Sequence, residues 1–84
     1  MRRAAKRDMN EAEIVTALRD AGHLVRQLND FDLLVQRPDG RLVALEVKNG
    51  KGRLTDAQAA MIRDGWRLNI VRSPLEALTV VENQ

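Results

Sequence analysis

Apolar residues recur at helical spacing in some stretches of this chain and alternate with polar residues in others. Helical spacing predicts a first helix over 11–21, because the apolar positions of this stretch fall on one face: Ile14, Ala17, Leu18 and Ala21. Asn10 is a good N-cap for this helix, and Gly22 is the residue type expected to end it.

Alternation predicts strands over 23–28, 31–36 and 41–49. Pro38-Asp39-Gly40 is a turn signature, because Pro fixes φ and Gly accepts a positive φ, so the last two strands are expected to form a hairpin. Side chains of a strand point alternately to its two faces. In the strand over 41–49, one face carries Val43, Leu45 and Val47, and the other carries Ala44, Glu46 and Lys48.

The second half of the chain predicts a helix, a strand and a last helix. Thr55 and Gln58 form a capping-box pattern that opens a helix reaching Ile62. The stretch 67–72 is an apolar strand, and Ser73-Pro74 is a typical start for the final helix. A strand–helix–strand connection favours a right-handed parallel crossover. The predicted fold class is therefore α/β, in the order αβββαβα, with a mixed sheet flanked by helices.

The 84 residues suggest a single domain over 10–84, preceded by a flexible basic arm over 1–9 that lacks apolar periodicity. A core of this size supplies only about 3–5 kcal/mol, so a homodimer that shares apolar surface is expected. The absence of cysteine excludes disulfides and thiolate zinc sites. No apolar run approaches the roughly 20 residues that span a membrane, so a soluble intracellular protein with no membrane partner is expected.

The formal net charge is only +2, but the basic residues gather locally. They gather in the N-terminal arm and around the end of the strand over 41–49: Arg2, Arg3, Lys6 and Arg7, then Lys48, Lys51 and Arg53. Basic clusters beside acidic residues suit contact with DNA phosphates. Phe31 and Trp66 are the aromatic residues of the chain, too few for a base-stacking platform of the single-strand-binding type. Trp66 is expected in the core or in a dimer interface.

Asp32 and Glu46 are acids placed in apolar strands, and burying an unpaired carboxylate is costly. If the hairpin turns at residue 39, the two acids lie close to opposite each other. Carboxylates brought together repel unless a cation lies between them, and such oxygen ligands suit Mg²⁺ or Mn²⁺. The alternative is structural: Glu46 would form a solvent-facing ion pair with Lys48, and Asp32 would cap a turn.

Glu11 and Gln58 could join this site from the flanking helices. At about 100° per residue, Glu11 falls on the edge of the helix face that packs on the sheet, and Glu13 falls outside that face. As acids of a first turn, both are equally well explained as partners of the helix dipole. Gln58 is explained by its cap, yet its helix opens shortly after Lys48, so its side chain could also face the acids.

The chain resembles the PD-(D/E)xK nuclease superfamily, and within it the small stand-alone VRR-NUC domains of phages and bacteria. The resemblance covers residues 10–78, and five stretches carry it in this order: Asn10-Glu11-Ala12-Glu13-Ile14-Val15, Asp32-Leu33-Leu34-Val35, Leu45-Glu46-Val47-Lys48, Leu54-Thr55-Asp56-Ala57-Gln58 and Val71-Arg72-Ser73-Pro74-Leu75-Glu76-Ala77-Leu78. Phe31 stands where the superfamily name has a proline, at a position with no chemical role. The resemblance implies a restriction-endonuclease-like core.

The resemblance further implies metal-dependent hydrolysis of DNA phosphodiester bonds. Asp32 and Glu46 would hold Mg²⁺ or Mn²⁺, with the Val47 carbonyl as an additional ligand. Lys48 would orient or activate the attacking water and stabilise charge on the phosphate.

In the same resemblance, Glu11 would complete the acidic metal cluster, and Gln58 would position Lys48 or the phosphate. The implied substrate is branched DNA such as a Holliday junction, cut by a homodimer with a site for each strand. The implied location is the cytoplasm of a bacterium or of a phage-infected cell.

Two other functions also fit the residues. A non-catalytic accessory module with the nuclease fold would bind nucleic acid in a salt-dependent way that does not respond to metal. A small interaction or antitoxin-like protein would carry the acids as surface groups that lie far apart. Metal-dependent cleavage separates the nuclease from both.

Overall fold

The computed structural model describes residues 9–29, 31–50 and 52–84. These residues form a small α/β fold with three helices and one four-stranded sheet. In chain order the elements are α1 (Met9–Asp20), β1 (Leu24–Gln27), β2 (Leu33–Gln36), β3 (Leu42–Val47), α2 (Asp56–Arg63), β4 (Leu68–Val71) and α3 (Pro74–Glu82). The predicted class, α/β with a mixed sheet and helices, is confirmed.

The sheet has the strand order β1-β2-β3-β4. The first two pairs of neighbouring strands are antiparallel, and β3 and β4 are parallel. The predicted hairpin is therefore present between β2 and β3, with Leu33 opposite Leu45 and Gln36 opposite Leu42. The parallel pairing through α2 is also as predicted.

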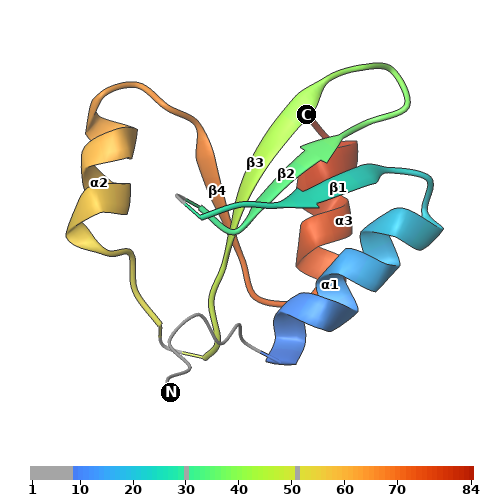
Figure 1. Ribbon diagram of the computed structural model, residues 1–84, viewed down its shortest axis with the longest axis horizontal. Coiled ribbons are helices and arrows are strands. Elements are labelled where there is room, and N and C mark those ends of the chain that lie inside the picture. The colour runs from blue at the N-terminus through green and yellow to red at the C-terminus, as the bar shows by residue number, and fades with distance from the viewer. Residues whose placement is uncertain (1–8, 30, 51) are drawn as a thin grey trace.

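One face of the sheet carries the core. Figure 1 shows α1 and α3 side by side against the sheet and α2 apart from both, next to β4. Apolar side chains of the sheet and of α1 and α3 form a buried cluster that includes Ile14, Leu18, Leu33, Val35, Val43, Leu45, Val47, Ala77 and Val81. Removing such apolar surface from water contributes roughly 25 cal/mol per Å². The face predicted for Val43, Leu45 and Val47 is thus confirmed as the core face.

The ends of the elements lie close to the predicted positions. α1 begins at Met9, so this residue belongs to the helix and not to the predicted arm, and Asn10 lies inside the helix instead of capping it. Thr55 caps α2, and both hydrogen bonds of the predicted capping box are present. Ser73 caps α3, as predicted from a serine that directly precedes Pro74.

The turn of the hairpin is held by Asp39. Its carboxylate accepts a hydrogen bond from the Arg41 N–H at 3.0 Å and pairs with Arg37 at 3.2 Å. The hydrogen bond from Arg41 lowers the pKa of the Asp39 carboxyl below its ordinary value of 3.8, and the Arg37 charge acts in the same direction. Gly40 adopts a φ of 92°, which residues with a side chain rarely adopt. Together these contacts fix the register between β2 and β3.

The described helices are short. α1, the longest of them, has 12 residues, and none of the helices in the described ranges is long and apolar enough to cross a membrane.

Candidate active site

The hairpin register, continued by one residue, places Asp32 opposite Glu46 at one end of the hairpin. Leu33 and Leu45 form the last pair of the ladder, and Asp32 precedes the first of them while Glu46 follows the second. Residues directly opposed on antiparallel strands have Cβ atoms about 4.5–5.5 Å apart. The observed register therefore agrees with the pairing predicted from the centre of the turn.

Glu46 is a buried carboxylate that is only half satisfied. Its Oε2 lies 3.1 Å from the Lys48 Nζ, and the two side chains are only 4% and 15% exposed. Its Oε1 is also buried and has no hydrogen-bond partner among the described residues. The pair is therefore not the solvent-facing ion pair of the structural alternative. A buried oxygen without a partner is costly, so this atom needs an explanation.

Asp32 is held against the backbone of β3. Its Oδ2 accepts a hydrogen bond from the Val47 N–H at 2.7 Å. Within a strand, the N–H and the C=O of one residue point toward the same neighbour. The Val47 carbonyl is therefore directed to the same side as Asp32, beyond the end of β2. Asp32, Glu46 and this carbonyl supply oxygen ligands of the kind that Mg²⁺ and Mn²⁺ bind.

Glu11 and Glu13 differ in burial, since Glu11 is 2% exposed and Glu13 is exposed. Glu11 is therefore the acid of α1 that faces the protein, and its Oε2 accepts a hydrogen bond from the Gln27 Nε2 at 3.0 Å. Gln27 lies opposite Leu33, so this contact is on the helix-covered side of the sheet, whereas Glu46 lies on the other side. The described ranges contain no group of three His, Cys, Asp or Glu side chains that could hold a metal ion. Metal binding by Glu11 stays a prediction.

Gln58 is buried in the first turn of α2. Its Oε1 accepts a hydrogen bond from the Thr55 N–H at 3.0 Å, and its own N–H donates to the Thr55 Oγ1 at 3.1 Å. The cap therefore occupies the side-chain oxygen and leaves the side-chain NH₂ as the group that could donate to a phosphate. The predicted role of Gln58 in the site stays a prediction.

Asn10 has a connecting role that the sequence did not indicate. Its Nδ2 donates to the backbone carbonyl of Lys48 at 3.2 Å and to that of Arg72 at 3.1 Å. α1 is thereby tied to the ends of β3 and β4, next to Glu11. The prediction of a helix cap at Asn10 is wrong, because the helix already includes Met9 and the amide bonds distant carbonyls instead.

Arg72 holds the loop that follows Lys48. Its Nη1 donates to the Gly50 carbonyl at 2.8 Å, and its Nη2 donates to the Gly52 carbonyl at 3.2 Å. Arg53, which follows this loop, is exposed and accessible to a phosphate. The other residues predicted to contact DNA from the arm and the loop lie outside the described residues: Arg2, Arg3, Lys6, Arg7 and Lys51.

This end of the sheet combines two opposed carboxylates, a buried ammonium group and a carboxylate oxygen without a partner in the described part of the chain. Such a set can bind a divalent cation and, through it and Lys48, a phosphate. No known family, no characterised protein and no solved structure gives a significant match to this chain.

Proposed function

We propose that this chain is a Mg²⁺- or Mn²⁺-dependent endonuclease that hydrolyses DNA phosphodiester bonds. The observation that carries the proposal is the buried, unpartnered Oε1 of Glu46, on a side chain that pairs with Lys48 and lies opposite Asp32. A half-satisfied buried carboxylate lowers stability, so a role in binding explains its presence better than a structural role does. The resemblance of residues 10–78 to the PD-(D/E)xK nucleases, which implies a restriction-endonuclease-like core of αβββαβα order, supports the same function.

The residues present fit a divalent cation. Mg²⁺ is usually bound through one or two carboxylates and keeps several waters. Asp32, Glu46 and the Val47 carbonyl would hold the ion, and Glu11 is a further candidate from α1. When bound, such an ion offsets negative charge on the phosphate and lowers the pKa of a water molecule.

Lys48 and Gln58 act on the phosphate and the attacking water in this proposal. The Lys48 side chain is 15% exposed, so solvent screens its charge less than that of a surface lysine. Its ammonium group orients the water and stabilises negative charge on the phosphate. The Gln58 oxygen already accepts a hydrogen bond in the helix cap, so only the Gln58 NH₂ is left. This NH₂ and the Lys48 ammonium group are both donors and cannot hydrogen-bond each other. Contact with the phosphate is therefore the better of the two roles predicted for Gln58.

Replacement of Lys48 by methionine is expected to slow DNA cleavage by roughly 100-fold or more, because a positive charge that acts in the transition state is lost. Lys48→Arg is expected to keep DNA affinity near that of the wild type and to recover only part of the rate, since guanidinium keeps the charge but does not exchange a proton. Single-turnover cleavage of a labelled four-way junction with Mn²⁺ measures both rates. Equal cleavage rates for Lys48→Met and the wild type would show that Lys48 has no role in the reaction.

Branched DNA is the proposed substrate class, and a homodimer is the proposed assembly. A two-fold axis would bring one site to each of two strands, and a second copy would enlarge a small core. Arg53 and the basic residues of the arm would contact phosphates without reading the base sequence.

A further inference from the structure

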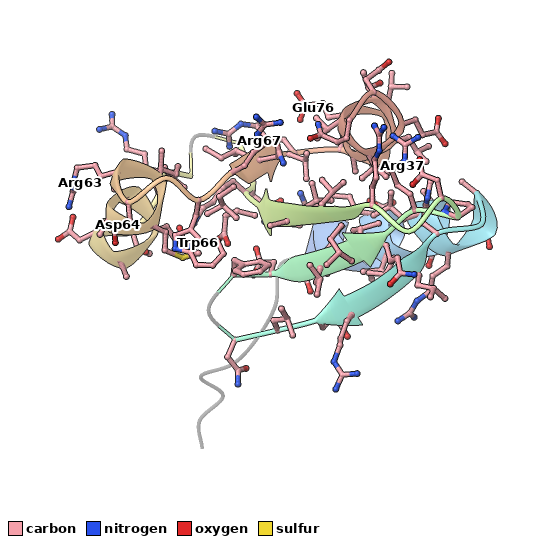
Figure 2. The ribbon with its side chains drawn as sticks, turned by 90° about the horizontal axis from the view of Figure 1, so that it is seen from above. Arg37, Arg63, Asp64, Trp66, Arg67 and Glu76 are labelled. Carbon is pink, nitrogen blue, oxygen red and sulfur yellow. The ribbon has the colours of Figure 1, made fainter. Side chains whose placement is uncertain are left out.

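Both aromatic residues of the chain line the same groove. The sequence contains one Phe, one Trp and no Tyr. The groove has a volume of about 720 Å³, and its lining includes Phe31, Leu34, Ala44, Met61, Trp66 and Leu68. Leu34, Ala44 and Leu68 come from three strands and Met61 from α2, whereas Phe31 precedes β2 and Trp66 lies between α2 and β4. The groove therefore lies between α2 and the sheet face that α1 and α3 leave open. Figure 2 shows Trp66 next to α2 and Arg67 pointing the opposite way.

The groove adjoins the residues proposed for catalysis. Phe31 directly precedes Asp32 in the chain. Ala44 lies on the same face of β3 as Glu46, one side-chain repeat away, which corresponds to about 6–7 Å along the strand. A nucleotide next to a phosphate bound at Glu46 would therefore reach this groove.

The lining of the groove exposes a large apolar surface. Trp66 is 66% exposed and Leu42, which also lines the groove, is 61% exposed. Contiguous apolar patches on the surface of a soluble protein mark binding sites. Trp66 is therefore not in the core, which was one of the two places expected from the sequence, and its exposed ring is available to a partner.

An unpaired nucleobase suits this groove better than a second copy of the chain does. The flat faces of a base stack on aromatic rings, and the groove supplies two rings on an apolar floor. Lys48, beyond one end of the groove, places positive charge near the phosphates that flank such a base. A second copy seated in the groove would instead cover the approach to Glu46 that DNA needs.

We infer that this groove binds unpaired bases of the DNA strand that is cut, so that the substrate carries a single-stranded segment next to the scissile phosphate. This inference rests on the proposed nuclease function and specifies its substrate class. The two rings form a local stacking site beside the catalytic residues. Two rings are too few for an extended base-stacking platform of the single-strand-binding type.

Trp66 is the single tryptophan and reports directly on the groove. The full chain, in EDTA to prevent cleavage, is titrated with a single-stranded oligothymidylate and with an abasic strand of the same length, and tryptophan emission is measured. The two strands carry the same phosphates and differ only in their bases. The oligothymidylate is expected to bind about tenfold more tightly or better. Equal affinities would overturn the inference in favour of phosphate contacts alone.

Phe31→Leu removes a ring and keeps an apolar side chain. It is expected to weaken binding of the oligothymidylate by roughly 5- to 100-fold and to leave binding of the abasic strand unchanged. Leu75→Ala is the matched control, because Leu75 is 74% exposed on α3 and lies outside the groove lining. If Phe31→Leu does not fold, Trp66→Leu, measured by the anisotropy of a labelled strand, makes the same test.

Two further results separate this inference from its competitors. A blue shift of Trp66 emission with rising protein concentration and a doubled mass, both without DNA, would assign the groove to a second copy and overturn the inference. Suppose that the bases of a strand quench Trp66 emission but the protein cuts no DNA. This result would contradict the nuclease function and support base binding in the groove. Cleavage of DNA together with equal affinities for the oligothymidylate and the abasic strand would support the nuclease function and contradict base binding in the groove.

Discussion

The Glu46→Gln protein is expected to cut DNA roughly a thousandfold more slowly than the wild type, or not at all, and to bind DNA with little change. Glutamine keeps the size of the side chain and an oxygen near Lys48, which lies 3.1 Å from Glu46, but it lacks the negative charge that would hold Mg²⁺ or Mn²⁺. Single-turnover cleavage of a labelled flap, which carries a single-stranded segment, measures the rate. Calorimetry with Mn²⁺ should show an affinity at least about tenfold weaker, since even outer-shell partners of metal ligands contribute that much.

The same substitution should leave the free energy of unfolding unchanged or raise it. Glu46 is 3% exposed and its Oε1 has no partner in the described part of the chain, so its charge is costly to bury. Glu13→Gln is the matched control, because Glu13 is an exposed acid on α1, and it should change neither rate nor stability. A Glu46→Gln protein that cuts at the wild-type rate, or that loses much stability, would identify Glu46 as a structural acid.

The Leu45→Ala protein is expected to lose about 3–5 kcal/mol of unfolding free energy, through lost burial and the cavity that remains. Leu45 is 0% exposed on β3 and directly precedes Glu46. The whole stability of a small domain is of similar size, so much of this protein should be unfolded at 37 °C. Urea titration followed by circular dichroism measures the loss.

Leu42→Ala is the control for Leu45→Ala, since it makes the same chemical change on the same strand. Leu42 is 61% exposed, so its truncation should change the unfolding free energy by no more than about 0.5 kcal/mol. Similar losses in the two proteins would contradict the assignment of one core face and one open face to the sheet.

The hairpin and its acids could be predicted from the sequence because both depend on local rules. Pro38-Asp39-Gly40 marks the turn, and a side-chain period of two then fixes which residues oppose each other and which share a face. Asp32 and Glu46 follow from these rules alone, as the observed register shows. The burial of Glu11 followed in the same way from the helical period.

Contacts between distant segments could not be predicted. The Asn10 amide bonds carbonyls at the ends of β3 and β4, and Gln27 donates to Glu11. An asparagine in a first turn and a glutamine on a strand have ordinary local explanations, so neither stands out in the sequence. The position of Trp66 is a similar case, because its apolar ring suits either the core or an interface, and the sequence alone does not decide between these two places.

The two faces of the sheet also limit what the helical period can predict. Glu11 is on the correct side of its own helix, yet its contact with Gln27 is on the core side of the sheet and Glu46 is on the other. Helical spacing shows on which side of its own helix a residue lies. It does not show which face of a neighbouring sheet carries the residues that the helical residue is expected to meet. The part of Glu11 in a cluster with Asp32 and Glu46 therefore stays a prediction.

Metal-dependent DNA cleavage at Asp32 and Glu46 is the central claim, and one cleavage panel tests it most directly. The purified chain is incubated with labelled duplex, flap and four-way-junction DNA in Mg²⁺, Mn²⁺ or EDTA, and products are resolved on denaturing gels. Branched DNA should be cut with Mg²⁺ or Mn²⁺ and left intact in EDTA, and Asp32→Asn should cut nothing. DNA binding that persists in EDTA, with no cleavage of any substrate under either metal, would contradict the claim and identify a non-catalytic module.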